Sequence, residues 1–370
     1  MKKIVFLPYK VHLKLLYDAL IRNASVRSIA DNGARAYICD EHQQWSMFTP
    51  VHFFGLHLWR HRMSIQSSLP LLVKDFERTM QKTKADVLVC FDVYHWYSIQ
   101  AIRYRKRHVD IKLVIYSETK RWPKSWLSRS ALWFFIWYMR RNAQHIDTVL
   151  VYTQEGIGFF ATHLPEFSPV LMPAPVDVEA FCVLPGKATL PRGVLRILMN
   201  ARYLPYKRHE DLFQAAADLL TKGKKMQITL IGRADSGRET IEKQVEKYGL
   251  QDVVTFREPL PMNEIPGLYH VHDVLILPSY NEAIGMVVPE AMACGLPTIT
   301  SDTVGANVYV KEGETGYIFP TGDVNAMVSR LLLLYDTGRL AEMGISARKQ
   351  AEHFTPKIVA DSLLKIVATP

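Results

Sequence analysis

Residues 274–295 read Val274-Leu-Ile-Leu277-Pro-Ser-Tyr-Asn-Glu282-Ala-Ile-Gly285-Met-Val-Val-Pro289-Glu290-Ala-Met-Ala-Cys-Gly295. The first four residues form an apolar run that predicts a buried strand. A helix is expected to begin near Met286, because Pro289 suits a first helical turn and Gly295 suits a helix end. A strand, a glycine turn and a helix in this order are typical of a parallel α/β sheet.

The same stretch has the chemistry of a site for an anionic, polyhydroxylated ligand. A helix start offers unpaired N–H groups and the positive end of the helix dipole, and both favour a phosphate. Gly285 allows the backbone to approach a ligand closely. The carboxylates of Glu282 and Glu290, eight residues apart, can accept hydrogen bonds from sugar hydroxyls. The plainer interpretation is that either glutamate only caps the helix.

The stretch resembles the E-x7-E signature of the retaining glycosyltransferases of the GT-B fold, specifically glycosyltransferase family 4 (glycosyl transferases group 1). The family pattern is P-S-x-x-E-G-x-G-x-x-x-x-E-A-M-A-x-G-x-P, and this chain departs from it with Ala283 where glycine is common. The resemblance continues through residues 297–302 and 313–316 and covers most of residues 195–355. It is far weaker over the first half of the chain.

The resemblance implies an α/β fold of the GT-B class, in which two Rossmann-like domains with parallel sheets face each other across a cleft. The length agrees, because 370 residues exceed the usual size of a single core. Proline and glycine concentrate at residues 173–194, which predicts a linker there. The expected parts are an N-terminal acceptor-binding domain at 1–172, the linker, a nucleotide-sugar-binding domain at 195–355 and a C-terminal helix at 356–370 that crosses back to the first domain.

Short β-rich runs alternate with helical stretches, a pattern that favours parallel sheets covered by helices. The strands expected in the first half are Ile4–Leu7, Ala36–Cys39, Asp86–Phe91, Lys112–Tyr116, Thr148–Tyr152 and Val170–Met172. Those expected in the second half are Leu195–Met199, Gln227–Ile231, Val253–Phe256, Val274–Leu277, Pro297–Thr300 and Tyr317–Phe319. The expected helices include Leu13–Ala30, Trp96–Arg107, His209–Thr221, Arg238–Tyr248, Val324–Leu334, Arg339–His353 and Pro356–Val367.

The composition indicates a globular protein, with 48% hydrophobic and 22% charged residues. The four cysteines are scattered and form no C-x-x-C motif, which favours a reduced compartment over a disulfide framework or a zinc site. The apolar run after Met1 spans only five residues and predicts a first strand rather than a signal peptide. We therefore expect a cytoplasmic location.

Donor contacts are implied by a second resemblance. The segment Asn200-Ala-Arg202-Tyr-Leu-Pro-Tyr-Lys207-Arg208 resembles the family's G-R-L-x-x-x-K-G, with alanine and Arg208 in place of the two glycines. It implies that Arg202 and Lys207 hold the donor diphosphate, and two fixed cations would stabilise the charge that develops on this leaving group. The plainer interpretation is a solvated basic loop.

Further donor contacts follow from the resemblance alone. Glu290 would bind ribose hydroxyls, and Glu282 would contact the transferred sugar as a catalytic residue. Backbone N–H groups of residues 285–287 would meet phosphate and sugar. The implied donor-binding residues are Arg202, Lys207, Gly232, Arg257, Gly285, Met286, Val287 and Glu290. The resemblance implies metal-independent chemistry without a cofactor, the nucleotide sugar being a substrate, and the lack of an Asp-x-Asp motif agrees with it.

The positive charge lies in the first half of the chain. Residues 1–150 hold 24 Lys and Arg against 11 Asp and Glu, a net charge of +13, whereas the remainder holds 21 against 25, a net charge of −4. This imbalance indicates an anionic partner for the first half, such as nucleic acid, an anionic membrane surface or an anionic acceptor. No nucleic-acid-binding motif is present, so nucleic acid is not the expected partner.

A basic, tryptophan-rich stretch at residues 121–141 indicates the membrane. It holds four of the seven tryptophans, five basic residues and no acid. Its apolar part is too short to span a bilayer, but a basic amphipathic helix of this kind is typical of an interfacial anchor. The residues expected to meet the membrane are Trp122, Trp126, Trp133, Trp137, Arg140 and Arg141. The alternative is a buried helix of the first domain.

The sequence indicates the residues that contact the acceptor less clearly than those that contact the donor. Many family members carry a histidine after a first-domain strand, and the corresponding position here is Glu118. Glu118 could face the cleft and serve the acceptor hydroxyl, and His95 is the alternative catalytic candidate, although a lone histidine is more often structural. Tyr9 and Lys10 replace the glycine-rich first loop of many relatives, which indicates an unusual acceptor pocket.

Together these features predict a retaining glycosyltransferase, expected to be a hexosyltransferase. It would move a sugar from a nucleotide-diphosphate sugar to a lipid-linked or surface-polysaccharide acceptor of the O-antigen, capsule or lipopolysaccharide type. The resemblance implies front-face attack, and the basic, tryptophan-rich stretch predicts a peripheral location on the inner face of the cell membrane. The alternatives are a GT-B nucleotide-sugar epimerase and a non-catalytic, membrane-associated sugar-nucleotide-binding protein.

Overall fold

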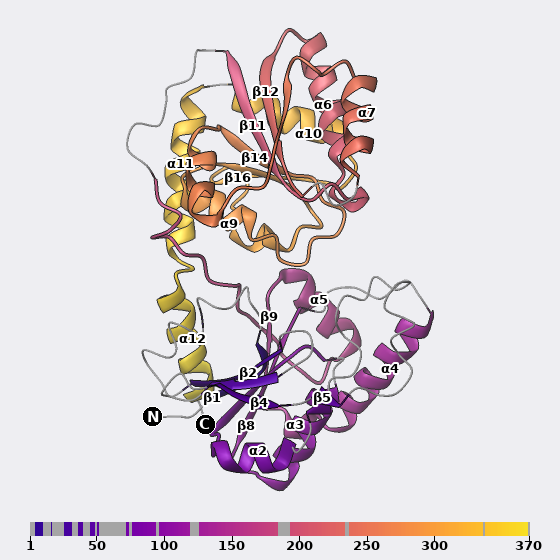
Figure 1. Ribbon diagram of the computed structural model, residues 1–370, viewed down its shortest axis with the longest axis vertical. Coiled ribbons are helices and arrows are strands. Elements are labelled where there is room, and N and C mark those ends of the chain that lie inside the picture. Colours follow the sequence, from indigo (N-terminus) through magenta and orange to yellow (C-terminus); the bar gives the residue numbers. More distant parts are fainter. Residues whose placement is uncertain are drawn as a thin grey trace. The chain divides into compact units, whose positions relative to one another are not determined.

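The chain folds as two compact units, Met1–Pro175 together with Pro356–Pro370, and Val176–Thr355 (Figure 1). The structure is a computed structural model that describes residues 4–9, 16, 26–31, 36–39, 45–48, 50–51, 72–73, 76–93, 96–118, 126–183, 193–233, 237–335 and 337–368.

The second unit is built on a parallel sheet of six strands in the order β13-β12-β11-β14-β15-β16. The strands are β11 (Val194–Asn200), β12 (Lys225–Ile231), β13 (Val254–Arg257), β14 (Val274–Leu277), β15 (Thr298–Ser301) and β16 (Gly316–Phe319). The helices are α6 (His209–Thr221), α7 (Arg238–Lys247), α8 (Ile265–His270), α9 (Val287–Ala293), α10 (Val324–Leu334) and α11 (Thr337–Glu352). In Figure 1, α6 and α7 lie on one side of the sheet, and α9 and α11 lie on the other.

Apolar burial explains this arrangement. All four residues of β14 are apolar and buried, as expected for a central strand covered on both faces. α6 buries Leu212, Phe213 and Leu219, and α10 packs beside it. Every strand and helix predicted within residues 195–355 is confirmed, with its ends within two residues of the expected positions.

The order of the strands reverses between β11 and β14. From β11 the sheet continues outward through β12 to β13, and from β14 it continues the other way through β15 to β16. Because all six strands are parallel, their carboxyl ends lie at one edge, and the chain leaves β11 and β14 in opposite directions. Ligand sites of open α/β sheets lie in the crevice that such a reversal creates.

The opposite edge is held by an ion pair. The carboxylate of Asp273, directly before β14, accepts hydrogen bonds from the backbone N–H of Arg196 in β11 at 2.8 Å and from the Arg196 guanidinium at 3.1 and 3.2 Å. The Asp273 side chain is only 5% exposed. The pair therefore fixes β11 against β14 at the point where the strand order reverses.

We expect Asp273→Ala to lower the free energy of unfolding of the chain by about 3–5 kcal/mol, because it leaves a largely buried guanidinium without this carboxylate. Urea denaturation at pH 7 measures the loss. The matched control is Asp218→Ala, which removes the exposed ion pair with Lys222 and should cost less than about 1 kcal/mol. Equal losses in the two variants would contradict the assigned role of Asp273.

The first unit contains a sheet of eight strands in the order β10-β9-β8-β7-β1-β2-β3-β4. The strands are β1 (Ile4–Tyr9), β2 (Val26–Asp31), β3 (Ala36–Cys39), β4 (Trp45–Phe48), β7 (Val87–Phe91), β8 (Lys112–Ser117), β9 (Thr148–Val151) and β10 (Val170–Leu171), and a separate pair comprises β5 (Pro50–Val51) and β6 (Leu72–Val73). The helices are α2 (Phe76–Thr83), α3 (Trp96–Arg107), α4 (Trp126–Arg141), α5 (Gln154–His163) and α12 (Pro356–Ala368).

This unit departs from the sequence prediction in two places. β3 and β4 pair antiparallel, so only the strands from β10 to β2 are parallel. The expected helix Leu13–Ala30 is wrong from Val26 onward, because β2 begins there and pairs with β1. The reason is non-local: the partner strand supplies the backbone hydrogen bonds, and a short apolar pattern does not distinguish a strand from a helix.

Candidate functional site

A cavity of about 350 Å³ lies in the second unit where β11 and β14 end. Its wall combines three charged side chains with an apolar side and the start of α9. The lining residues are Asn200, Lys207, Leu260, Met262, Ile265, Glu282, Gly285, Met286, Val287 and Glu290. The predicted contacts Lys207, Glu282, Gly285, Met286, Val287 and Glu290 are thus brought together in one cavity.

Lys207 and Glu282 form an ion pair in this cavity. Lys207 ends the short 3₁₀ helix η4 (Pro205–Lys207) after β11, and its side chain is only 10% exposed. Its ammonium group donates a hydrogen bond to Oε2 of Glu282. The backbone of Glu282 is fixed in turn, because its carbonyl oxygen accepts a hydrogen bond from Gly305 at 2.9 Å. Both charges are therefore held in place by the scaffold.

The turn between the two glutamates requires glycine. Gly285 has a φ of +77°, in the left-handed region that side chains disfavour, and a Cβ atom there would lie 3.1 Å from Cγ of Glu282. α9 begins two residues later. It ends at Ala293, and Gly295 follows the helix end as predicted, with a φ of +70° and an N–H that donates to the carbonyl of Met292 at 2.9 Å.

Glu290 projects from α9, and its carboxyl group has a shifted pKa. Burial raises the pKa of its carboxyl group from 4.5 to about 7. A hydrogen bond from the hydroxyl of Tyr269 to Oε2, at 3.3 Å, acts in the opposite direction. Tyr269 lies on α8 and is fully buried. Sequence reasoning missed this residue, because no spacing relates α8 to α9.

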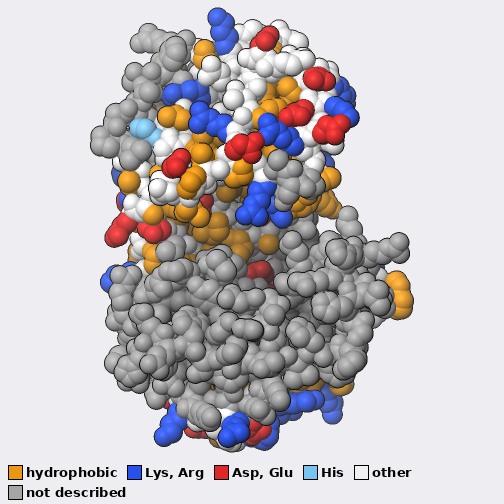
Figure 2. Space-filling view, in the orientation of Figure 1, with side chains coloured by type: hydrophobic (Ala, Val, Ile, Leu, Met, Phe, Trp, Pro, Cys, Tyr) orange, Lys and Arg blue, Asp and Glu red, His pale blue; other side chains and the backbone are white. Residues whose placement is uncertain are grey.

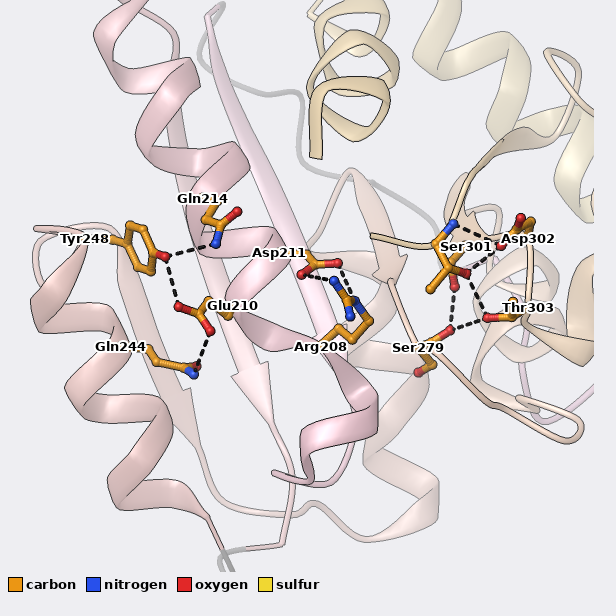
Figure 3. Close-up of polar contacts among 11 residues, drawn as sticks. Arg208, Glu210, Asp211, Gln214, Gln244, Tyr248, Ser279, Ser301, Asp302 and Thr303 are labelled. Atoms are coloured by element: carbon orange, nitrogen blue, oxygen red, sulfur yellow. Dashed lines mark hydrogen bonds and ion pairs between the residues drawn. The ribbon is translucent and has the colours of Figure 1, made fainter. Parts of the chain in front are cut away.

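Polar contacts among residues outside the cavity lining hold the segments that lead to it (Figure 3). The carbonyl of Ser279 accepts hydrogen bonds from the hydroxyls of Ser301 at 2.6 Å and Thr303 at 2.8 Å, which anchors the segment that leads to Glu282. Arg208, at a position where the family has glycine, adopts a φ of +55° and binds the carboxylate of Asp211 at 2.6 and 2.9 Å. This ion pair therefore holds Arg208 in a backbone conformation that glycine adopts more easily.

Three predicted donor-binding residues do not line the cavity. Arg202 is exposed and donates to the hydroxyl of Tyr206 at 2.9 Å, and Arg257 is exposed at the end of β13. Gly232 is explained by packing, since a Cβ atom there would lie 2.2 Å from the carbonyl oxygen of Ala201. A role of these three residues in donor binding stays a prediction.

The first unit places Glu118 beside a second acid. Glu118 follows β8, and its backbone N–H donates to Oδ1 of Asp92 at 2.7 Å. Asp92 follows the neighbouring strand β7, is buried and has a φ of +62°, unusual for a residue other than glycine. Sequence reasoning missed Asp92. His95 lies outside the described residues, so its predicted catalytic role stays a prediction.

Helix α4 has two different faces. Leu132, Phe135, Ile136 and Met139 are buried, as the alternative of a core helix predicts. Trp126, Trp133 and Trp137 are 73%, 54% and 55% exposed. Each interpretation of this stretch therefore describes one face of the helix.

Basic side chains accompany the tryptophans of α4. Arg140 and Arg141 are exposed near its end, and Arg140 binds Glu166 at 2.7 Å. Lys and Arg side chains also lie along the end of the unit that carries α2 and α3 (Figure 2). Trp122 lies outside the described residues. None of the described helices combines the length and the apolar composition that crossing a membrane requires.

The model of the family described as glycosyl transferases group 1 matches residues 185–350, which include every residue that lines the cavity. Over these residues, the chain matches this family. The resemblance seen in the sequence is thereby confirmed.

Similar sequences carry the name D-inositol 3-phosphate glycosyltransferase. The protein of Streptomyces bingchenggensis is 32% identical over 227 residues, which cover 56% of this chain and 50% of that protein. The protein of Corynebacterium diphtheriae is 31% identical over 234 residues, which cover 59% and 55%. The chain thus spans about half the length of the curated relatives it matches.

Solved structures share the fold over the whole chain. Sucrose-phosphate synthase from Thermosynechococcus elongatus has a TM-score of 0.74 at 19% identity and covers 100% of this chain and 98% of its own. Anabaena HepE in complex with UDP-glucose has a TM-score of 0.71 at 17% identity and covers 100% of both chains. The predicted GT-B fold class is confirmed.

Among the described residues, no group of three or more His, Cys, Asp or Glu side chains is placed to hold a metal ion. Among the described residues that line the cavity, Lys207 supplies a cationic group, its ammonium. Metal-independent chemistry stays a prediction.

The raised pKa of Glu290 predicts a pH-dependent stability. Because the unfolded chain releases this proton near pH 4.5 and the folded chain near pH 7, the contribution of Glu290 to the free energy of unfolding declines across this window. Glu290→Gln cannot ionise. Its stability relative to the wild type should therefore rise by up to about 3 kcal/mol between pH 4.5 and pH 7.5.

Urea denaturation at four pH values across the window measures this difference. The control Glu314→Gln, at an exposed position outside the cavity, reports the general effect of removing a negative charge. A difference between wild type and Glu290→Gln that stays constant from pH 4.5 to pH 7.5 would show that the carboxyl group is not perturbed.

Proposed function

We propose that the chain is a glycosyltransferase that takes a sugar from a nucleoside diphosphate sugar, and that the cavity of the second unit binds this donor. The observation that carries the proposal is the convergence of Lys207, Glu282 and Glu290 on one cavity within the residues that match the family. HepE has been solved in complex with UDP and with UDP-glucose, which supports a nucleotide sugar as the donor.

The chemistry of the cavity suits each part of such a donor. The apolar wall of Leu260, Met262 and Ile265 fits the nucleoside, and Glu290 accepts hydrogen bonds from the ribose hydroxyls. The ammonium of Lys207 stabilises the diphosphate as the glycosidic bond breaks, because a fixed cation needs little reorganisation when charge develops. No metal ion takes part in this proposal.

Glu282 is the residue proposed to contact the transferred sugar. Its carboxylate is paired with Lys207 in the structure, so an incoming diphosphate competes with Glu282 for the ammonium group. Once Lys207 binds phosphate, the carboxylate can accept hydrogen bonds from the sugar. The proposed reaction retains the anomeric configuration and proceeds by front-face attack, as in the related family.

The proposed acceptor is a lipid-linked or surface-polysaccharide intermediate. The exposed tryptophans and arginines of α4 support it, since a basic amphipathic helix binds an anionic membrane surface. The chain would then act at the inner face of the cell membrane. The names of the similar sequences favour a second candidate, a phosphorylated polyol such as inositol phosphate.

Glu282→Gln tests the proposed chemistry. The substitution keeps the size of the side chain and removes its charge, so we expect the kcat/KM of sugar transfer to fall by about 100-fold or more. The measurement uses labelled UDP-, GDP- and ADP-sugars with lipid-linked saccharides and inositol phosphate as acceptors. The matched control Glu314→Gln should leave transfer unchanged.

The products of this assay distinguish a glycosyltransferase from an epimerase and from a binding protein. Unchanged transfer by Glu282→Gln would reject the proposed site. A released epimer of the nucleotide sugar in place of a glycoside would identify an epimerase. Binding of the donor by the wild type without any product would indicate a binding protein.

Flotation with anionic liposomes tests the membrane contact. We expect the double variant Trp133→Ala/Trp137→Ala to lower the bound fraction by roughly tenfold, because both side chains are more than half exposed on α4. The control Val271→Ala/Ile345→Ala removes two exposed apolar side chains elsewhere and should bind as the wild type does. Equal binding by all three proteins would count against the anchor.

A further inference from the structure

We propose that Tyr269 is a positioning residue for the donor: its hydroxyl fixes the Glu290 carboxylate in the orientation that receives the vicinal hydroxyls of the nucleotide ribose. This inference rests on the proposed function of the cavity. It assigns the role to a residue on α8, an element that lies outside the two motifs that define the site in the sequence.

The position of Tyr269 is set by the protein core. The residue is fully buried, and its ring packs against that of Phe181, with the ring centres 6.2 Å apart. A side chain that is buried in this way cannot change its rotamer without disturbing its neighbours. The hydroxyl group is therefore held at a fixed point, 3.3 Å from Oε2 of Glu290.

Three elements meet at this hydroxyl. Tyr269 comes from α8 and Glu290 from α9, and the side chain of Asn200, at the end of β11, lies near enough to the tyrosine oxygen to lower its pKa. Asn200 and Glu290 line the cavity, whereas Tyr269 lies behind them. A network of this form orients the acid without occupying the space of a ligand.

The hydrogen-bonding capacity of the carboxylate leaves room for a diol. An ionised carboxylate has about four lone-pair positions on its two oxygens, and Tyr269 uses one of them on Oε2. The second oxygen, Oε1, and the remaining position on Oε2 can accept hydrogen bonds from two adjacent hydroxyl groups. A phenylalanine at position 269 would fill the same volume but leave the carboxylate free to rotate.

The hydrogen bond from Tyr269 also affects the ionisation of Glu290. Burial raises the pKa of the carboxyl group, and the hydrogen bond from Tyr269 lowers it, because the bond favours the ionised form. Tyr269 stays protonated, since burial and Glu290 raise its own pKa well above 10. Other titratable or charged groups at the cavity or on elements packed against α9 include Lys207, Glu282, Cys294, Tyr309 and Arg348.

Calorimetric titration of Tyr269→Phe with nucleoside diphosphates tests the inference. UDP, GDP and ADP are titrated into the full chain between pH 5.5 and pH 8.5, and the 2′,3′-dideoxy form of the diphosphate that binds serves as the second probe. We expect the variant to bind the ribose form about tenfold more weakly at pH 8. The midpoint of its pH dependence should also move upward, while binding of the dideoxy form stays close to that of the wild type.

Two further variants make the result specific. Glu290→Gln supplies the reference curve, since the phosphate of the probe itself titrates near pH 6. Tyr248→Phe is the matched control, because the hydroxyl of Tyr248 donates to the carboxylate of Glu210 at 2.9 Å away from the cavity (Figure 3). It should reproduce the wild-type curve.

The outcomes separate this inference from the proposed function. If the wild type binds none of the three diphosphates, the proposed function fails and the inference fails with it. If the wild type binds and Tyr269→Phe shows the wild-type midpoint and affinity, only the inference is overturned. Equal weakening for the ribose and dideoxy probes without a shift of the midpoint also overturns it, because it would indicate a purely structural role.

Discussion

The reversal of strand order between β11 and β14 is the constraint on which the candidate site depends. Because the six strands of the second unit are parallel, every loop that leaves a carboxyl end lies at one edge of the sheet. The loops after β11 and β14 then diverge and leave a cavity between them. At the opposite edge, the ion pair between Arg196 and Asp273 fixes these same two strands against each other. Core stability and site geometry therefore depend on one strand pair.

Charge within the cavity follows from that geometry. The Lys207–Glu282 pair satisfies two charges that would otherwise be costly to bury, while Glu290 faces Tyr269, a neutral donor. One acid is thus paired with a cation, whereas burial raises the pKa of the other to about 7. Two glutamates only eight residues apart have different electrostatic surroundings because a helix begins between them.

The fold of the second unit could be predicted almost completely, since apolar strands and amphipathic helices alternate there with clear turn residues. β14 and α6 have the predicted bounds, and Gly295 follows the end of α9 as expected. Prediction was weaker in the first unit, where Val26–Asp31 is a strand because β1 lies beside it. A partner strand is a property of the whole fold, and no local pattern of residues specifies it.

The sequence by itself determined that Glu282, Gly285 and Glu290 share one loop and helix, because local spacing sets their separation and the glycine allows a φ of +77°. It also determined the two faces of α4, because helical periodicity separates Trp133 and Trp137 from Leu132 and Ile136. Only the tertiary structure decided that Lys207 meets Glu282 across 75 positions and that Tyr269 meets Glu290 across 21. Those pairs depend on which strands and helices become neighbours, and the packing of the whole unit sets that order.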